Sequence, residues 1–577
     1  MIKKLAKSIR QYKRDSILAP IFVSLEVVME VIIPLLMANL IDFGIEAGNM
    51  SYIMRIGLFL ILSAVVSLIF GALSGKHAAI ASAGYAKNLR HDMYYNVQNF
   101  SFSNIDKFST ASIVTRLTTD VTNLQNAYQM IIRVAVRCPI MLIFSLMMAF
   151  KIKPQLALIF LCAIPFLAVG LYLIMSRAHP IFERVFRTYD KLNNVVQENL
   201  HGIRVVKSFV REDYEEDKFK NISGSIYKDF SKAEKILAFN NPLMQFTVYL
   251  CMLLVSWFGA RLIVGGNMTT GQLMSLITYT MQILMSLMML SMVFVMIVIS
   301  RASAERIAEI LDEESNLHNC DDPVYTVSDG SVDFDGMSFG YSPKKMCLKN
   351  IDLHIKSGET VGIIGGTGSS KSSLVQLIPR LYDVSEGTLK VGGLDVRQYD
   401  IESLRNEVAM VLQKNELFSG TIKENLRWGC EDASDEELIR VCKLAQADDF
   451  IRTFPNGYDT YIEQGGSNVS GGQKQRLCIA RALLKKPKIL ILDDSTSAVD
   501  TKTDALIRKA FREEIPDTTK IIIAQRISSV EDADIIVVLD NGRIDGVGTH
   551  EELLKTNAIY QEVYNSQVKG GGENAAK

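Results

Sequence analysis

The sequence has almost no net charge, no paired cysteines and no long hydrophobic run beyond its first 300 residues. Its 577 residues carry a formal net charge of −1, so there is no basic field that would favour nucleic acid as a partner. The eight cysteines are scattered, with no Cys-x-x-Cys pair, which argues against a metal cage and a secreted disulfide framework. We therefore expect the soluble part of the chain to lie in a reducing cytoplasm.

Long apolar segments are the main feature of the first half. The hydrophobic content is 48%, and six runs each approach the ~20 residues with which a helix spans a hydrocarbon core. These runs lie at residues 17–41, 53–73, 130–150, 156–175, 246–264 and 273–300. The sequence thus predicts a membrane domain of six spanning helices.

The basic N-terminal sequence MIKKLAKSIRQYKR sets the expected topology, because the positive-inside rule places it in the cytoplasm. A signal peptide fits less well, since the first apolar run is too long and no small-residue cleavage site follows it. Six crossings return the C-terminal half to the cytoplasm, where ATP is available. Lys151 and Lys153 fall in a short outer loop and count weakly against this topology. We expect a multi-pass protein of the plasma membrane.

Two connections between the spans, residues 74–129 and 176–242, are long and polar. Their helical pattern without strong breakers predicts cytoplasmic extensions of the spanning helices. Each contains a segment that mixes apolar and basic residues, 108–121 and 202–212, and we expect these segments to dock on another domain. The alternative is a solvated helix surface.

The helical pattern ends in DEESNLHNCDDP, which contains Pro323, and this places a domain boundary near residue 320. Beyond it, short β-rich runs alternate with helical stretches, the pattern of an α/β nucleotide-binding domain. The expected organisation is a transmembrane domain at 1–319, a nucleotide-binding domain at 320–565 and a disordered tail at 566–577.

A glycine-rich loop lies between the strand-like VGII and the helix-like LVQLI. Such a loop folds its backbone N–H groups around phosphate oxygens at a helix N-terminus, while its lysine reaches the terminal phosphates and the following hydroxyl binds Mg²⁺. The residues expected to hold ATP are Gly365, Gly366, Thr367, Gly368, Ser369, Ser370, Lys371, Ser372 and Ser373. Ser370 replaces the last glycine of G-x-x-x-x-G-K-[ST], and left-handed backbone there costs a serine about 1–2 kcal/mol. We expect a loosened nucleotide geometry.

Polar residues follow two later apolar strands. Asp493 ends the run ILIL and is expected to hold Mg²⁺ through water. Asp494 stands where a glutamate should polarise the attacking water, and it is one methylene shorter. General-base catalysis contributes ~10²–10⁴-fold to the rate, and it requires the base to lie within hydrogen-bond distance of the proton that it accepts. Gln525 occupies the place of a histidine after the next strand, where it can orient water but cannot become a cation.

In this order, these motifs resemble the nucleotide-binding domain of an ATP-binding cassette (ABC) transporter, and the first 319 residues resemble the six-helix membrane domain of the exporter class. The resemblance implies an all-α six-helix transmembrane domain followed by an α/β P-loop domain that hydrolyses ATP to drive transport. It also implies that Tyr341 stacks on adenine, that Gln413 contacts Mg²⁺ and water, and that Asp500 lies between two ATP sites. Tyr341 alone is weak support, because it also fits a strand side chain.

The motif VSGGQ is intact. By resemblance, it is the signature that clamps ATP bound to the opposite subunit, formed by Ser470, Gly471, Gly472 and Gln473. Ser370, Asp494 and Gln525 instead all fall in the site that the chain's own phosphate loop builds. This asymmetry is similar to one half of heterodimeric bacterial exporters with one degenerate ATP site, and Gln464, where many relatives have glutamate, marks a variant subgroup. It implies a homologous partner subunit that carries the competent glutamate and histidine.

Charged and sulfur-containing residues inside the spans are candidates for substrate contact. Glu26 and Glu30 share one face of the first span, and Arg133 and Arg137 share one face of the third. Mutual ion pairing and contact with a cationic substrate are both open. A stripe of methionines on the sixth span suits either an adaptable pocket or helix packing. The stripe consists of Met281, Met285, Met288, Met292 and Met296.

The expected function is ATP-driven export of small amphipathic compounds, of the multidrug type, by alternating access. Lipid or peptide export is the alternative within the exporter class. An ATP-gated regulatory or channel subunit that binds ATP and hardly hydrolyses it is the alternative of a different class. Substrate-stimulated hydrolysis and uptake into vesicles separate these hypotheses, because a regulator shows neither.

Overall fold

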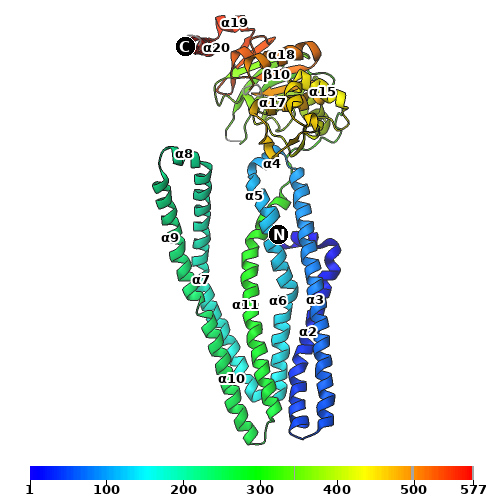
Figure 1. The fold of residues 1–577 in the computed structure, drawn as a ribbon, viewed down its shortest axis with the longest axis vertical. Helices are drawn as coiled ribbons and strands as arrows, with labels where there is room; N and C mark the ends of the chain where they lie inside the picture. The colour runs from blue at the N-terminus through cyan, green and yellow to red at the C-terminus, as the bar shows by residue number, and fades with distance from the viewer. Residues whose placement is uncertain (343–344, 495–498, 575–577) are drawn as a thin grey trace. The chain divides into compact units, whose positions relative to one another are not determined.

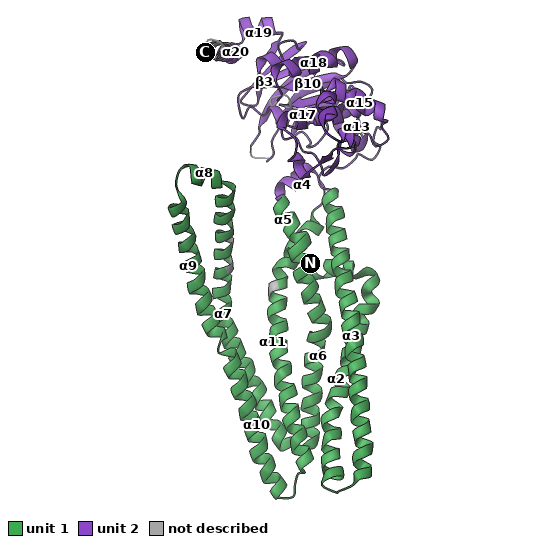
Figure 2. Cartoon of the chain, in the orientation of Figure 1, with its two compact units in different colours: residues 1–98, 110–313 green, residues 99–109, 314–577 purple. Residues whose placement is uncertain are grey.

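The computed structural model describes residues 1–342, 345–494 and 499–574. The chain divides into two compact units (Figure 2). The helical unit comprises residues 1–98 and 110–313, and the sheet unit comprises residues 99–109 and 314–577. The predicted boundary near residue 320 lies a few residues beyond the division after Glu313.

Six helical segments dominate the helical unit (Figure 1). Among the described residues, six segments are long and apolar enough to cross a membrane, which confirms the predicted number of spans. Their bounds are Ile2–Ile45, Met50–Gln98, Thr110–Ile152, Pro154–His201, Glu212–Val264 and Thr270–Asp312. They consist of α1 (Ile2–Leu5), η1 (Ala6–Tyr12), α2 (Lys13–Leu40), η2 (Ile41–Ile45), α3 (Met50–Gln98), α5 (Thr110–Thr115), η3 (Arg116–Asp120), α6 (Val121–Ile152), α7 (Pro154–His201), α9 (Glu212–Leu237), α10 (Asn240–Val264) and α11 (Thr270–Asp312).

The longest helices extend well beyond the length that a bilayer requires. Helix α3 has 49 residues and α7 has 48, or about 70 Å at 1.5 Å per residue, against a hydrocarbon core of about 30 Å. The short helix α8 (Ile203–Ser208) joins α7 to α9, and in Figure 1 this end of the pair stands apart from α3, α6 and α11. Val205, Phe209 and Val210 are exposed there.

The sheet unit is built on a six-stranded sheet in the order β12-β11-β3-β10-β9-β6. All neighbouring strands are parallel except β11 and β12. On β9, Ile489 and Ile491 enter one hydrophobic core while Leu490 and Leu492 enter another, so both faces of this strand are buried. The strands are β3 (Thr360–Gly365), β6 (Val408–Val411), β9 (Ile489–Asp493), β10 (Thr519–Ile523), β11 (Ile535–Asp540) and β12 (Arg543–Gly548).

A smaller antiparallel sheet in the order β2-β1-β4-β5 and the pair β7–β8 complete the strands. They are β1 (Val332–Phe339), β2 (Leu348–Ile355), β4 (Glu386–Val391), β5 (Leu394–Asp395), β7 (Gly420–Thr421) and β8 (Tyr461–Ile462). The helices of the sheet unit after the linker are α12 (Lys371–Gln376), α13 (Ile401–Glu407), α14 (Ile422–Arg427), α15 (Asp435–Leu444), α16 (Asp448–Thr453), α17 (Gly471–Leu484), α18 (Thr501–Glu514), α19 (His550–Thr556) and α20 (Ala558–Asn574). Helix α20 occupies most of the range 566–577, and residues 575–577 lie outside the described residues.

Helix α4 (Phe102–Lys107) comes from the first long connection but belongs to the sheet unit (Figure 2). The Tyr382 hydroxyl donates to Asp106 Oδ2 at 2.7 Å, and the Phe102 ring meets the Tyr382 ring edge-on. The prediction that 108–121 docks is therefore wrong in position, because the docked segment is 99–109. Most of 108–121 stays in the helical unit, where Asp120 is buried and pairs with Arg306 of α11.

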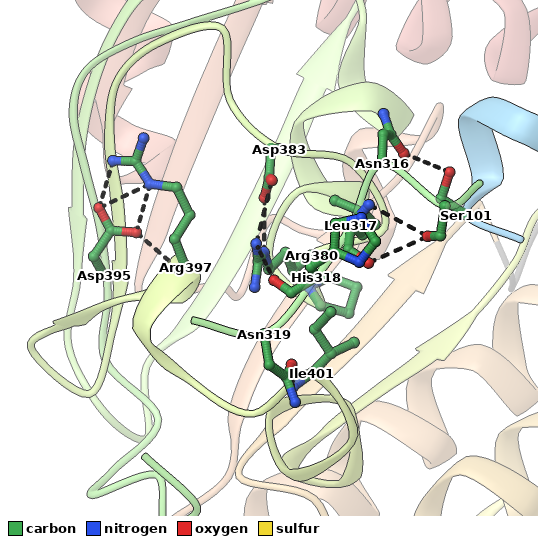
Figure 3. A network of polar contacts seen from close by, with 12 residues as sticks. Ser101, Asn316, Leu317, His318, Asn319, Arg380, Asp383, Asp395, Arg397 and Ile401 are labelled. Atoms are coloured by element: carbon green, nitrogen blue, oxygen red, sulfur yellow. Dashed lines mark hydrogen bonds and ion pairs between the residues drawn. The ribbon is translucent and has the colours of Figure 1, made fainter. Parts of the chain in front are cut away.

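The linker after α11 is fixed to the sheet unit by polar contacts (Figure 3). Asn316 Oδ1 accepts from the Ser101 hydroxyl at 2.6 Å, which ties the linker to the start of α4. The buried Arg380 donates to Asp383 at 2.7 Å and to the carbonyl of His318 at 3.2 Å. The linker and α4 thus both contact the segment that follows the phosphate-loop helix α12, at Arg380 and Tyr382.

Candidate functional site

The predicted ATP-site residues gather where adjacent parallel strands end. The phosphate loop follows β3, Asp493 ends β9, and Gln525 comes directly after Ala524 beyond β10. Because β3, β10 and β9 are neighbours in the sheet, these three points lie along one edge. Ligands of open α/β sheets bind at the carboxyl ends of such strands.

The phosphate loop has the backbone that the sequence predicts. Ser370 lies at φ 71° and ψ 26°, the left-handed conformation, immediately before α12. A side chain at Gly365 would come within 2.1 Å of the Leu539 carbonyl oxygen, so only glycine fits at that position. The loop residues 366–369 bring the chain from β3 to the start of α12.

The Lys371 ammonium points back into its own loop. It donates to the carbonyl oxygens of Gly365 at 2.8 Å and Gly366 at 2.9 Å, and to the Ser369 hydroxyl at 3.3 Å. Burial lowers the pKa of Lys371, and the charges of Asp493 and Asp494 oppose this shift. A buried ammonium held by neutral carbonyls is suited to exchange them for phosphate oxygens.

Ser372 and Asp493 form an oxygen-rich pair. The Ser372 hydroxyl donates to Asp493 Oδ1 at 3.0 Å, and burial raises the pKa of Asp493. Hydroxyl and carboxylate oxygens are ligands that Mg²⁺ prefers. The described residues contain no cluster of three or more His, Cys, Asp or Glu side chains suited to a metal. This donor set therefore fits an ion that also takes oxygens from the phosphates of a nucleotide.

Asp494 lies between two glutamine side chains. Its Oδ2 accepts from the Gln525 amide at 2.7 Å and from the Gln413 amide at 3.3 Å. Its backbone is left-handed, with φ 48°. Burial raises the pKa of Asp494, while the two amide donors act in the opposite direction. The sequence predicts a site role for each of these three residues, but not their direct hydrogen bonding.

Gln567 on α20 is a site residue that the sequence analysis missed. Its side-chain amide donates to the Gln525 carbonyl oxygen at 2.8 Å and accepts from the Ile527 N–H at 3.0 Å. This bidentate contact holds the backbone on both sides of Arg526. No motif marks Gln567, because only the folded position of α20 brings it to this loop.

Tyr341 lies beside the phosphate-loop helix. Its hydroxyl lies 3.0 Å from the Ser373 hydroxyl, and its ring meets Phe339 and Tyr382 edge-on. The side chain is 54% exposed, so an aromatic surface next to the phosphate loop remains open.

The signature residues occupy a different surface at the start of α17. Ser470 caps this helix in extended conformation, and its hydroxyl accepts from the Gln473 N–H at 3.4 Å. In return, the Gln473 side chain accepts from the Ser470 N–H at 2.9 Å. Ser470 and Gly471 are exposed, and Gly472 is half-buried. The N-terminus of a 14-residue helix is thus open to an anion.

Asp500, which follows the signature helix in the chain, caps α18 by accepting from the Thr503 N–H at 3.0 Å. Gln464, which precedes the signature, begins a 3₁₀ turn, η6 (Gln464–Gly466). Residues 495–498 lie outside the described residues.

Six spans followed by a P-loop α/β unit define an ATP-driven membrane transporter. The chain belongs to the ABC transporter family. The family model of the ABC transporter transmembrane region matches residues 16–288, and that of the ABC transporter matches residues 348–497. This confirms the predicted fold class and the hydrolysis of ATP coupled to transport.

Three similar proteins show more closely which kind of ABC transporter the chain resembles. It is 35% identical over 570 residues, 98% of each chain, to an uncharacterised ABC transporter ATP-binding protein of Bacillus subtilis. It is 33% identical to the ATP-dependent lipid A-core flippase of Desulfotalea psychrophila over 83% of this chain and 84% of that protein. A solved bacterial Atm1-family ABC exporter with ATP bound matches with a TM-score of 0.83 at 26% identity, covering 96% of this chain and 99% of that chain. The protein is an ABC exporter half of the plasma membrane.

Proposed function

We propose that this chain is one half of a heterodimeric exporter of small amphipathic compounds. In this proposal its own ATP site is degenerate, and its signature motif serves the competent site of a homologous partner. The observation that carries the proposal is the hydrogen bonding of Asp494. A general base must present a free acceptor to water, whereas Asp494 Oδ2 already accepts from two glutamine amides.

The degenerate site still has the groups to hold ATP and Mg²⁺. We assign phosphate binding to the loop residues 365–373 and adenine stacking to Tyr341. The Mg²⁺ ligands are Ser372, Asp493 and Gln413, and the bound ion would neutralise charge on the phosphates. Asp494 and Gln525 orient water without activating it efficiently. The residues that complete the partner's site are Ser470, Gly471, Gly472 and Gln473.

Steady-state phosphate release tests this assignment. The full chain purified alone contains only copies of the degenerate site, so we expect at least about tenfold less release than from the chain co-expressed with its homologous partner. Comparable rates for the two preparations would contradict the proposal. A neighbouring reading frame for an exporter half with the glutamate and histidine, but with a corrupted signature, would identify the partner.

We further propose that residues 202–209 pass the closure of the ATP sites to the membrane helices. Helix α8 leaves Val205, Phe209 and Val210 exposed, and such an apolar tip is suited to docking on a nucleotide-binding unit. Val205→Asp with Phe209→Asp should abolish transport while nucleotide binding persists. Tyr227→Asp, at an equally exposed aromatic residue of α9, is the matched control. Unchanged transport by the double variant would remove this role.

Lipid export is the second candidate, because one similar protein is named as a lipid A-core flippase. Reconstituted exporter that moves a fluorescent phospholipid across the bilayer, but does not move amphipathic amines, would favour this candidate. If neither cargo stimulates hydrolysis, the chain is instead a regulatory or channel subunit.

A further inference from the structure

The loop at residues 524–527, which follows β10 and carries Gln525, is bound at its centre by Gln567 of α20. The Gln567 amide donates to the Gln525 carbonyl oxygen at 2.8 Å and accepts from the Ile527 N–H at 3.0 Å. Arg526, between these two groups, is extended, with φ −98° and ψ 129°. In extended backbone, the carbonyl before a residue and the N–H after it point the same way, and a neighbouring parallel strand binds both. One side-chain amide therefore takes the place of a neighbouring strand at this point.

Helix α20 is held in place by its buried face. Tyr560, Tyr564 and Gln567 lie at helical spacing, so they share one face of the helix. Tyr560 is fully buried, with its hydroxyl 2.7 Å from His550 Nδ1, and the His550 ring meets the Tyr564 ring edge-on. The helix also contacts α19, its neighbour in Figure 1, and the 3₁₀ turn η7 (Ile527–Ser529). Packing thus sets the position from which Gln567 reaches the loop.

The direction of the Gln525 side chain depends on the backbone that Gln567 binds. The loop is fixed at its start, where the Ala524 N–H donates to a carbonyl oxygen of β3 at 3.2 Å, and at its end, where Ile527 is buried. Gln525 and Arg526 lie exposed between these two points. Successive side chains of an extended segment point to opposite sides, so a turn of the backbone at Arg526 would turn Gln525 as well. Gln567 opposes that turn.

The Gln525 side chain continues this chain of contacts to Asp494. Its amide donates to Asp494 Oδ2 at 2.7 Å, and the Gln413 amide donates to the same oxygen at the longer distance of 3.3 Å. Asp494 follows β9, which pairs with β10, so the two strand ends lie side by side. A carboxylate oxygen that accepts from two amides is less available to accept a proton from water. The bonds of Gln567 therefore bear on how Asp494 is used.

We infer that Gln567 is a positioning residue that holds the Gln525 amide on Asp494 and thereby keeps this ATP site slow. The inference rests on the proposed function, because it concerns the site that is degenerate in that proposal. It adds that the slow state of the site is maintained from the C-terminal helix. When the loop is released from Gln567, the Gln525 amide leaves Asp494 Oδ2, and this oxygen can accept from water instead.

Turnover of ATP by the full-length chain, purified alone in lipid nanodiscs, tests this role. Gln567→Met removes both hydrogen bonds and keeps an unbranched side chain of similar length. We expect it to raise kcat about threefold, a small part of the ~10²–10⁴-fold that a general base contributes. The KM for ATP should stay within about twofold, because the phosphate loop is unchanged.

A double-variant cycle shows whether Gln567 acts through Gln525. Gln525→Met should raise kcat to the same extent as Gln567→Met, and the double variant should exceed neither, because each change removes the same amide from Asp494. Gln561→Met is the matched control. It lies on the same helix, its amide donates to the Leu554 carbonyl oxygen at 2.8 Å, and its loss should leave kcat unchanged.

Hydrogen exchange of the Ile527 N–H reports release of the loop without relying on activity. Gln567→Met should speed this exchange about tenfold, which corresponds to the net contribution of one hydrogen bond. Gln561→Met should leave it unchanged. Retained ATP binding and a single elution peak identify folded protein in every variant.

The possible outcomes separate this inference from the proposed function. The inference alone is overturned if Gln525→Met raises kcat and Gln567→Met does not, if the two effects add, or if exchange at Ile527 is unchanged. An unchanged kcat in both single variants overturns the inference together with the role proposed for Asp494. Equal turnover by the chain alone and by the co-expressed pair, with coinciding effects of the two variants, overturns the proposed division of the ATP sites and supports the positioning role.

Discussion

The sheet unit presents two functional surfaces that differ in how their polar groups are used. Around the phosphate loop, Ser370 and Asp494 have left-handed backbone without being glycine, and Asp494 binds two neighbouring amides. At the start of α17, Ser470 has ordinary cap geometry and is exposed. Residues with strained backbone, whose hydrogen bonds are made within the chain, can hold a ligand on this chain. An exposed helix N-terminus can instead complete a site on another molecule.

The largest expected effect separates these two surfaces by mutation. In the proposed heterodimer, Ser470→Arg should reduce steady-state hydrolysis about 100-fold, because a bulky cation would occupy the place of the clamped phosphate. Asp494→Ala should do far less, since little chemistry depends on it. Both are measured as phosphate release at saturating ATP, beside a variant without the partner's catalytic glutamate, which should resemble Ser470→Arg. Equal damage from Asp494→Ala and Ser470→Arg would show that the weak site is not in this chain.

A smaller effect is expected from repairing the phosphate-loop surface. Asp494→Glu with Gln525→His should raise hydrolysis by the chain alone about tenfold, because the carboxylate gains reach and loses one competing amide. Asp494→Glu alone should gain less, since Gln525 still donates to the carboxylate. The comparison of the double and single variants is the control. If the double variant is as slow as the wild type, hydrogen bonding at Asp494 does not limit the reaction.

Backbone strain at the phosphate loop predicts a gain in stability. Ser370→Gly should stabilise the protein by about 1 kcal/mol, because glycine adopts φ 71° without a Cβ clash. Ser467→Gly, at φ −60° near the signature, is the matched control and should destabilise. Thermal unfolding in detergent without nucleotide measures both. A lower midpoint for Ser370→Gly would mean that the serine side chain stabilises the loop.

The smallest expected effect is a pH dependence near the signature surface. Hydrogen bonds from Thr503 to the cap lower the pKa of Asp500. The ionised cap therefore adds stability that is present above the ordinary aspartate pKa and is lost as the pH falls through the lowered value. Asp500→Asn should lower the unfolding temperature slightly at neutral pH, and the difference should disappear in acid. Asp517→Asn is the exposed control, and a pH-independent difference for Asp500→Asn would contradict the assignment.

Local patterns were sufficient to predict the six spans, the phosphate loop and the strand ends. Hydrophobic run length and the order of motifs depend on neighbouring residues, so they are visible in the sequence. The left-handed conformation at Ser370 was predictable in the same way, because the motif normally has a glycine at this position. Contacts between distant segments were not predicted. The Asp494–Gln525 bond, for example, requires the parallel pairing of β9 with β10.

In the helical unit, too, local patterns were predicted from the sequence and contacts between distant segments were not. Spacing alone placed Glu26 with Glu30 on one helix face and Arg133 with Arg137 on another. Only the packing of α2 against α6 brings Arg137, and not Arg133, between the carboxylates. Packing also places α4 in the sheet unit, so a prediction from composition put the docking segment too late in the chain.

The amide of Gln567 has a practical consequence for handling this protein. It lies near the C-terminus, where affinity tags are usually fused and flexible ends trimmed, yet it bonds to the backbone on both sides of Arg526. A chain shortened before α20 would therefore lose a brace of the loop that carries Gln525. An N-terminal tag avoids this, and hydrolysis rates measured on shortened chains would describe an altered enzyme.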